Sequence, residues 1–263
     1  MTAPNRNTLW ARAIVDELAA GGVGRIVIAP GSRSTPLTVA ADSDERIQTY
    51  SHLDERSAGF FALGQGKRLG RPTALISTSG TAAANFHPAI VEATQSRTPL
   101  LVLTADRPPE LWDSGANQTI DQQHLYGDAP RFARTLPEPE PTPRKLRSLR
   151  TTVARAVAAA TGTEPGPVHL NVPFRKPLAP IEVDGDVPDD LAERHPEAVH
   201  GRDGPFVRAQ SGTMSPSAAV IEDLGSTIDA ADRGLIVAGP KSPRHPDADV
   251  REPIAEIGAV TGF

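Results

Sequence analysis

The stretch PLLVLTADRP, from Pro99 to Pro108, indicates the fold class of the chain. Its apolar side chains follow one another without alternation, and the run ends in the charged pair Asp106 and Arg107. Continuous apolar strands are typical of parallel sheets that are buried on both faces. The same design recurs in three other stretches, which are RIVIAPG at 25–31, TALISTSG at 73–80 and GPVHLNVPF at 166–174. We therefore expect four strands of one mostly parallel sheet.

Helical patterns fill the segments between these strands. The first helix is expected over Asn7–Ala20, because Trp10, Ile14 and Leu18 share one face. Asn7 is its expected N-cap, and Gly21–Gly22 is expected to end it. Further helices are expected near 57–68, 81–93 and 146–160. Strands that alternate with helices predict an α/β fold, in which helices cover both faces of the sheet.

Composition excludes several classes of protein. The 263 residues carry 27 basic and 32 acidic side chains, for a net charge of -5, and no run of Lys or Arg forms a nucleic-acid surface. The absence of cysteine excludes disulfides, Cys-ligated zinc and a cysteine nucleophile. We find neither a signal peptide nor the run of ~18 apolar residues that a membrane span needs. A cytoplasmic protein is expected.

The character of the chain changes after Pro180. Residues 1–180 are expected to form the first domain, and residues 181–210, rich in Asp, Glu, Pro and Gly, have the composition of a linker. Residues 211–263 contain one expected strand, RGLIVAGPKS at 233–242, and one expected helix, REPIAEIGAV at 251–260. They are interpreted as the incomplete start of a central α/β domain.

Polar residues follow the ends of several expected strands. Ligands of such sheets bind beyond the carboxyl ends of the strands. In PGSRS, Ser32 and Arg33 suit an anion, unless this is an ordinary turn with a surface arginine. In TSGTA, Gly80 permits a close backbone approach and the hydroxyls of Thr78 and Ser79 suit a polar ligand; the alternative is a capped helix packed on the sheet.

Two more motifs carry candidate binding groups. In TADRPPEL, two prolines stiffen the loop after Arg107, although Asp106 and Arg107 could form a plain surface pair. In GANQTIDQQ, the amides of Asn117 and Gln118 could read a heterocycle, or the loop could simply be solvated. GQGKRLG has the spacing of neither a dinucleotide fingerprint nor a P-loop.

The stretch SHLDERSAGFFALG, at 51–64, sets three charges before an apolar run. An acidic residue near the positive end of a helix can serve as no more than a cap. A carboxyl group carried into a dry site would instead need a partner that shares its proton.

Taken in order, APGSRSTPLT, SHLDERSAGFFALG, TSGTAAAN, LTADRPPEL and GANQTIDQ resemble the N-terminal domain of the 2-succinyl-5-enolpyruvyl-6-hydroxy-3-cyclohexene-1-carboxylate synthases. These SEPHCHC synthases are thiamin-diphosphate enzymes of menaquinone biosynthesis. The resemblance runs from about Leu9 to Pro180 and implies a pyrimidine-binding domain. It also implies transferase activity, in which 2-oxoglutarate is decarboxylated and its succinyl unit is added to isochorismate.

The resemblance further implies roles for individual residues. Glu55 is the implied catalytic residue and hydrogen-bonds the aminopyrimidine of the cofactor. The other implied cofactor contacts are Thr78, Ser79, Gly80 and Gln118. The implied substrate contacts are Ser32, Arg33, Arg107 and Asn117. No metal ligand is implied within this chain.

The cofactor implied is thiamin diphosphate with Mg²⁺, or manganese. In the family a Gly-Asp-Gly…Asn motif binds the metal and the diphosphate, whereas VDGDVPDD here has only Asp184-Gly185-Asp186. We therefore expect the diphosphate half of the site to lie outside residues 1–263 and this chain alone to bind the cofactor weakly. A homodimer or homotetramer with its active site between subunits is implied.

Two alternatives remain open. The chain could belong to another thiamin-diphosphate decarboxylase or lyase that acts on a 2-oxoacid. It could instead be a catalytically silent fragment that serves as a binding or assembly module.

Overall fold

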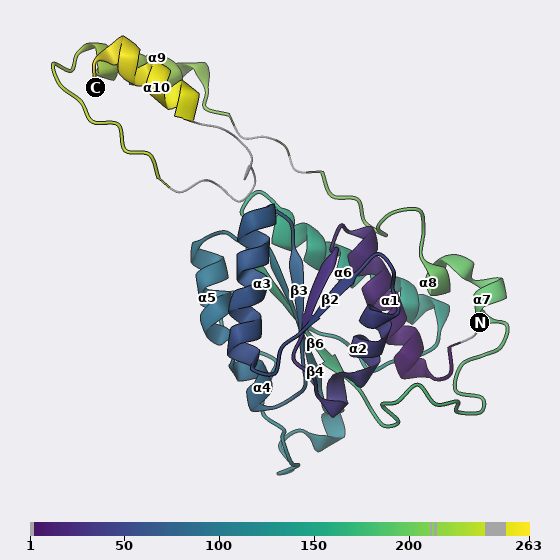
Figure 1. The fold of residues 1–263 in the computed structure, drawn as a ribbon. Coiled ribbons are helices and arrows are strands. Elements are labelled where there is room, and N and C mark those ends of the chain that lie inside the picture. The colour runs from purple at the N-terminus through teal and green to yellow at the C-terminus, as the bar shows by residue number, and fades with distance from the viewer. Residues whose placement is uncertain (1–2, 211, 213–214, 240–250) are drawn as a thin grey trace.

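The computed structural model describes residues 3–210, 212, 215–239 and 251–263. Its first part is built on a six-stranded sheet with the strand order β2-β1-β3-β4-β6-β5. Every neighbouring pair in this sheet is parallel, which confirms the predicted α/β class (Figure 1). The strands are β1 Arg25–Ile28, β2 Gln48–Ser51, β3 Thr73–Ser77, β4 Leu100–Asp106, β5 Phe132–Thr135 and β6 Pro167–Pro173.

The four predicted strands form the inner part of the sheet, and the two that were missed form its edges. Every residue of β3, β4 and β6 is buried, as continuous apolar runs require. The edge strands β2 and β5 have the sequences QTYS and FART, and no residue of either is fully buried. They carry no apolar run because each has only one neighbouring strand and stays partly open to solvent.

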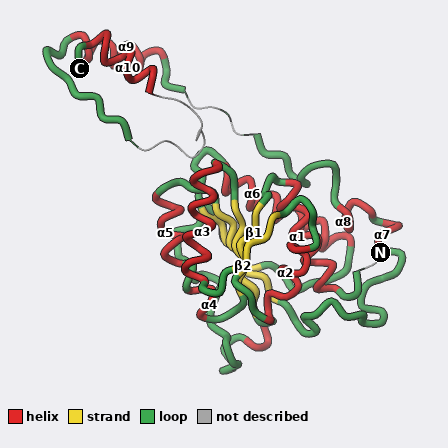
Figure 2. Tube along the Cα trace, in the orientation of Figure 1, coloured by secondary structure: helices red, strands yellow, loops and turns green. Residues whose placement is uncertain are grey.

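Helices cover both faces of the sheet (Figures 1 and 2). On one face, α1, α2 and α6 pack on a cluster that includes Ile26, Ile76 and Leu103. On the other, α3 and α5 pack on Val27 and Leu75, because successive residues of a strand point to opposite faces. The helices of this part are α1 Arg6–Ala20, α2 Thr35–Asp42, α3 Glu55–Leu69, α4 Thr81–Ala84, α5 His87–Gln95 and α6 Pro143–Thr161, with 3₁₀ turns η1 Ser32–Ser34 and η2 Pro109–Leu111.

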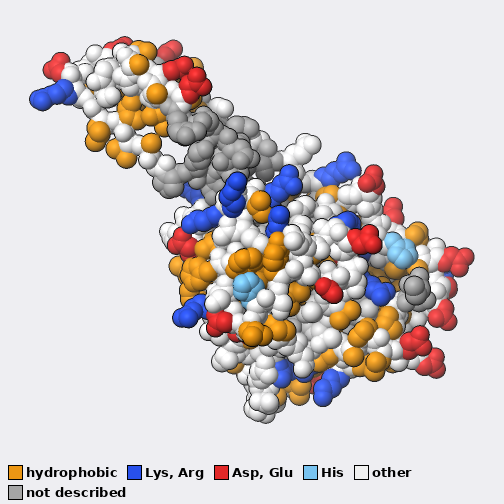
Figure 3. Space-filling view, viewed as in Figure 1, with side chains coloured by type: hydrophobic (Ala, Val, Ile, Leu, Met, Phe, Trp, Pro, Cys, Tyr) orange, Lys and Arg blue, Asp and Glu red, His pale blue; other side chains and the backbone are white. Residues whose placement is uncertain are grey.

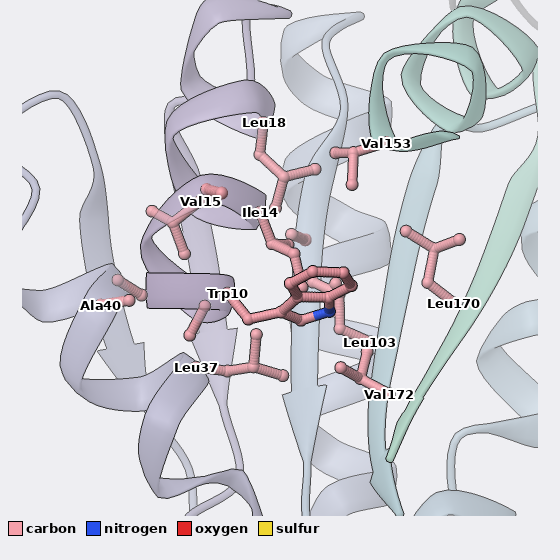
Figure 4. Close-up of a cluster of buried hydrophobic side chains, with 14 of the residues drawn as sticks. Trp10, Ile14, Val15, Leu18, Leu37, Ala40, Leu103, Val153, Leu170 and Val172 are labelled. Carbon is pink, nitrogen blue, oxygen red and sulfur yellow. The ribbon is translucent and has the colours of Figure 1, made fainter. Parts of the chain in front are cut away.

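The first helix begins one residue earlier than expected, and a different asparagine caps it. Asn5 has extended backbone and its side chain accepts the N–H of Thr8 at 2.9 Å, so Asn7 is not the N-cap. Asn7 is buried instead, and its amide donates to the carbonyls of Arg175 and Pro177 at 2.6 and 2.7 Å. Trp10 lies in the centre of the core, facing β4 and β6 (Figure 4).

The helix expected over residues 81–93 is divided into α4 and α5. Pro88 is the second residue of α5. Proline has no N–H to donate and its ring collides with the preceding turn, so it is tolerated at the start of a helix but not in its interior. The break before His87 therefore follows from the position of this proline.

The segment with linker composition contains α7 Leu191–Arg194 and α8 Pro196–His200, and it packs on the first domain. Leu191 and Ala198 are buried in the same core as α1 and α6. The buried Arg150 of α6 donates to the carbonyls of Ala198 and Val199 at 2.9 and 2.7 Å. Glu17 of α1 accepts the N–H of Phe206 at 2.5 Å.

The last part contains α9 Ala218–Asp229 and α10 Arg251–Thr261. Helix α10 confirms the prediction from REPIAEIGAV. The strand expected from RGLIVAGPKS is absent over residues 233–239, where Leu235 and Val237 are 85% and 82% exposed; residues 240–242 lie outside the described residues. A strand needs a partner for its backbone groups, and the described residues provide none here. No helix in the described ranges combines the length and apolar character needed to cross a bilayer.

Candidate functional site

The loops after β1, β3 and β4 meet at one edge of the sheet. These strands are parallel neighbours, with Ile28 beside Ile76 and Ser77 beside Thr104, so their carboxyl ends share that edge. The guanidinium of Arg107, after β4, donates to the Oγ of Ser79, after β3.

Arg33 lies buried at the same edge. Its guanidinium donates to the carbonyl of Phe174 at 2.8 Å, and its Nε is buried without a partner among the described residues. Burial lowers the pKa of Arg33, as does the positive charge of Arg107, while Asp106 opposes the shift. Two guanidinium groups beside one carboxylate leave this edge with a net positive charge, which suits an anionic ligand.

The loop that carries Gln118 packs tightly on the turn after β3. Gly80 has a φ of 80°, and a Cβ at this position would lie 2.8 Å from the Cγ of Gln118. The side chain of Gln118 donates to the carbonyl of Ser79 at 3.0 Å. A Cβ on Gly31, after β1, would collide with the side chain of Thr78. Only glycine therefore fits at these two positions, and the three loops interlock.

Ser32 and Asn117 remain outside this cluster. Ser32 begins η1 and is exposed, and Asn117 is exposed in the loop before Gln118. Within the described ranges neither side chain has a hydrogen-bond partner. The structure thus joins Arg33, Ser79 and Arg107 with the neighbouring residues Thr78, Gly80 and Gln118, and leaves Ser32 and Asn117 at their margin.

Glu55 lies apart, as the first residue of α3. The carboxylate of Asp54 accepts the N–H of Ser57 at 2.7 Å and caps the helix, and this hydrogen bond is the main cause of the lowered pKa of Asp54. Glu55 is half-buried, and no described residue hydrogen-bonds its carboxylate. Helix α3 follows β2, which lies three strands from β4 in the sheet, so at ~4.8 Å per strand the axes of these two strands are about 14 Å apart.

The apolar run after Glu55 only partly turns inward. Ala58 and Ala62 are buried against the sheet and α5, whereas Phe60 and Phe61 are 44% and 38% exposed. Leu53, before the helix, is 90% exposed. The run is therefore only partly buried in the described chain, because one helical face buries only every third or fourth residue. Figure 3 shows hydrophobic side chains gathered on the side of the molecule that α3 covers.

Sequence reasoning missed two buried amides beneath this edge, Gln122 and Asn171. Asn171 donates to the carboxylate of Asp106 at 2.8 Å. Burial raises the pKa of Asp106, while the hydrogen bonds from Asn171 and the N–H of Arg107 oppose the shift. The signal in the sequence is the single amide within the apolar strand VHLNV, since a buried polar group needs partners.

One of two cavities lies next to the site edge, and the other lies away from it. A cavity of about 160 Å³ is lined by Asp106, Trp112, Gln122 and other residues of the segment 106–123. A larger one, of about 500 Å³, lies against α1, the turn after α2, and α7 and α8, and no predicted site residue lines it. Neighbouring acidic and basic side chains, such as Asp44 and Arg46, are already paired there.

A family model described as the N-terminal TPP binding domain of thiamine pyrophosphate enzymes matches residues 10–125. That range includes the loops after β1, β3 and β4, the start of α3 and the loop with Gln118. No helix after α5 falls within it.

Three of the similar proteins carry the same name. The chain is 63% identical over 242 residues to a 2-succinyl-5-enolpyruvyl-6-hydroxy-3-cyclohexene-1-carboxylate synthase of Halobacterium salinarum, which covers 91% of the chain and 41% of that protein. Synthases of the same name from Halorubrum lacusprofundi and Natronomonas pharaonis are 60% and 58% identical, over 100% of the chain and 42% and 46% of their own lengths. The chain thus spans less than half the length of these relatives. The chain thus carries the N-terminal TPP binding domain of thiamine pyrophosphate enzymes, and over nearly all of its length it is similar to SEPHCHC synthases.

Proposed function

We propose that this chain forms the pyrimidine side of a thiamin diphosphate site in an SEPHCHC synthase. The protein that contains it would release carbon dioxide from 2-oxoglutarate and join the succinyl unit to isochorismate. The observation that carries this proposal is the positive edge formed by Arg33 and Arg107, where the Nε of Arg33 is buried and has no partner in the described ranges. Both proposed substrates are carboxylates, and guanidinium groups hold carboxylates in a fixed orientation.

Glu55 fits the aminopyrimidine of the cofactor. Its carboxylate heads α3 with no partner among the described residues, so it is free to share a proton with a ring nitrogen. When bound, thiamin diphosphate supplies the nucleophilic carbon and the electron sink for decarboxylation and carboligation. Glu55 would hold the shared proton, while Thr78, Ser79, Gly80 and Gln118 would shape the wall on the other side.

The substrate-binding roles follow from charge and exposure. Arg33 and Arg107 would bind carboxylate groups, and Ser32 and Asn117, exposed at the margin, would add hydrogen bonds to the same ligands. Asp106 holds the backbone of Arg107 through a 2.7 Å hydrogen bond to its N–H. Fixed donors of this kind stabilise developing negative charge without reorganising during the reaction.

The metal and the diphosphate would be held elsewhere. Among the described residues, no group of three or more His, Cys, Asp or Glu side chains is arranged to hold a metal ion. We therefore propose that Mg²⁺, or manganese, binds with the diphosphate to residues other than those described here.

A second copy of the chain would complete the site. Leu53 precedes Glu55, Phe60 and Phe61 follow it in α3, and all three are exposed; exposed apolar groups of this size indicate an interaction surface. We propose a homodimer or homotetramer that covers this surface and so removes water from Glu55. Desolvation would then favour the protonated form of the carboxyl group that the chemistry uses.

A substrate comparison tests the function. The native protein that contains this chain is incubated with thiamin diphosphate, Mg²⁺ and 2-oxoglutarate, with and without isochorismate. We expect the succinylated product to form and carbon dioxide release to rise when isochorismate is present. Carbon dioxide release from another 2-oxoacid, but not from 2-oxoglutarate, would instead identify a different decarboxylase or lyase. No turnover of any 2-oxoacid would favour a silent module.

A further inference from the structure

The buried side chain of Gln122 joins three separate segments at the site edge. Its Oε1 accepts the N–H of Gly80 at 2.8 Å. Its Nε2 donates to the carbonyl of Ala105 at 3.2 Å and to the Oδ1 of Asn171 at 2.8 Å. One amide therefore connects the turn after β3, the end of β4 and the middle of β6.

The direction of these hydrogen bonds is determined by Asp106. Asp106 accepts the Nδ2–H of Asn171 at 2.8 Å and the backbone N–H of Arg107, so both of its carboxyl oxygens face donors. The Oδ1 of Asn171 then faces Gln122 and the hydroxyl of Thr104, which donates to it at 2.9 Å. Gln122 must in turn present its NH₂ to Asn171 and its oxygen to Gly80.

The other end of the network is a neutral histidine. Because Thr104 gives its only proton to Asn171, the Nε2 of His169, 2.7 Å from the Thr104 hydroxyl, must be the donor in that pair. Burial lowers the pKa of His169 to about 3, so the ring stays neutral near pH 7. The hydrogen bonds then run in one direction. His169 donates to Thr104, Thr104 donates to Asn171, and Asn171 donates to Asp106.

Gln118 and Gln122 hold the same turn from two sides. Gln118 donates to the carbonyl of Ser79, and Gln122 accepts the N–H of the next residue, Gly80. The two glutamines lie four residues apart in one loop, so an anchor at Gln122 also fixes where Gln118 begins. Gln118 has a φ of 56°, a conformation that L residues rarely adopt, and the anchored loop keeps it there.

We propose that Gln122 is a positioning residue, which sets the Ser79–Gly80 turn and the Gln118 loop for the ligands of this edge. The catalytic meaning of this role rests on the proposed synthase function. Gln122 is buried and acts through Gly80 and Gln118 rather than by touching substrate.

Replacement of Gln122 tests the proposal. Gln122→Met keeps the length of the side chain and removes all three hydrogen bonds. Gln122→Glu keeps an acceptor for Gly80 and replaces the NH₂ group that faces two oxygens. Small displacements of positioning groups lower rates by as much as about 10²-fold. We expect both variants to lower kcat by about 10- to 100-fold, with smaller changes in KM.

A control variant separates positioning from general destabilisation. The buried hydroxyl of Tyr126 donates to the carbonyl of Ala83 at 2.7 Å, close to the same turn but outside the network. Tyr126→Phe removes one buried hydrogen bond and should lower stability, while kcat should stay within about twofold because this residue does not position the ligand. An equal loss of kcat in Tyr126→Phe would overturn the proposal.

A double variant tests whether Gln122 acts through Gln118. If it does, the kcat of Gln118→Ala combined with Gln122→Met should be no lower than that of the worse single variant. Multiplicative effects of the two substitutions would contradict the proposal.

A measurement without turnover keeps this proposal separate from the proposed function. Hydrogen exchange at the Gly80 amide should be slow in the native protein and much faster in Gln122→Met, with little change in Tyr126→Phe. Rapid exchange in the native protein would overturn the positioning role, even if neither variant folds. If the native protein does not use 2-oxoglutarate, the proposed function fails, while slow Gly80 exchange that Gln122→Met releases would still support the positioning role.

Discussion

The guanidinium of Arg107 donates a hydrogen bond to the hydroxyl oxygen of Ser79, so the ends of β4 and β3 are joined at the site edge. The backbone of Arg107 is held as well, because the carboxylate of Asp106 accepts its N–H. Arg33 approaches from η1, and its buried Nε has no partner in the part of the chain that the structure describes. The positive edge thus brings together segments that are far apart in the sequence. The hydrogen bond between Arg33 and Phe174 joins residues that are 141 positions apart.

Replacing either arginine of this edge should impair the use of an anionic substrate. Loss of a charge-assisted hydrogen bond costs roughly 1.5–3 kcal/mol, which corresponds to about tenfold to 150-fold. Arg33→Ala and Arg107→Ala should lower kcat/KM for 2-oxoglutarate or isochorismate by that factor and change the Kd of thiamin diphosphate much less. Arg68→Ala, in the exposed last turn of α3, is the control and should change neither quantity. A shift in cofactor affinity alone would assign the arginines a different role.

Gly80 should tolerate no side chain. Its φ of 80° and the nearby Gln118 make Gly80→Ala both strained and crowded, at a cost of about 1–3 kcal/mol in the free energy of unfolding. Gly64→Ala is the matched control, because Gly64 lies inside α3 with open space at its Cβ position. That change should stabilise the helix by about 0.5–1 kcal/mol. Urea unfolding of both variants would measure the difference, and equal effects would contradict the packing described here.

The segment 196–208 should depend on Arg150. This guanidinium is fully buried and contacts Asp16 and Glu17 as well as two carbonyls of the segment. Arg150→Ala would leave Glu17 buried without its cationic partner, so we expect a loss of about 3–5 kcal/mol and faster proteolysis near Phe206. Arg175→Ala, which removes exposed pairs with Glu110 and Glu138, should leave the unfolding midpoint nearly unchanged.

Stability should fall in acid because of His169. Its pKa is about 3 in the folded chain and about 6.5 when unfolded, so the unfolded chain binds the proton first as pH falls. The stability that neutral His169 contributes is complete above about pH 6.5 and is lost progressively toward pH 3, with a slope of up to about 1.4 kcal/mol per pH unit. His169→Gln should reduce the slope of unfolding free energy between pH 4 and 6. His124→Gln, at an exposed position, should not.

The inner sheet was predictable because its strands are buried on both faces. LLVL in β4 and ALI in β3 can be read as strands without knowing their neighbours. The edge strand QTYS carries no such signal, since its place depends on pairing with β1. The stretch LIVAG has the apolar pattern of a strand, yet over residues 235–239 it is not one, because no described segment pairs with it.

The candidate site was predictable in its positions and not in its contacts. Ser79 and Arg107 stand out because turn residues and charges follow apolar runs, and Gln118 stands out as an amide in a polar loop. Nothing local distinguishes the cap Asn5 from Asn7, or shows that Asn7 reaches carbonyls 168 and 170 residues away. Gln122 was overlooked for the same reason, since its partners come from three segments far apart in the sequence.

The exchange of one atom in Glu55 tests the central claim most directly. Glu55→Gln keeps the size of the side chain and its hydrogen-bonding ability but cannot share a carboxyl proton with the cofactor. In the native protein, supplied with thiamin diphosphate, Mg²⁺, 2-oxoglutarate and isochorismate, product formation should fall by about 10²–10⁴-fold. Glu92→Gln, on the exposed surface of α5, is the control and should retain full activity. Product formation by Glu55→Gln within about threefold of the native rate, far above the range expected for a lost acid–base group, would contradict the assignment of Glu55 and of the cofactor site.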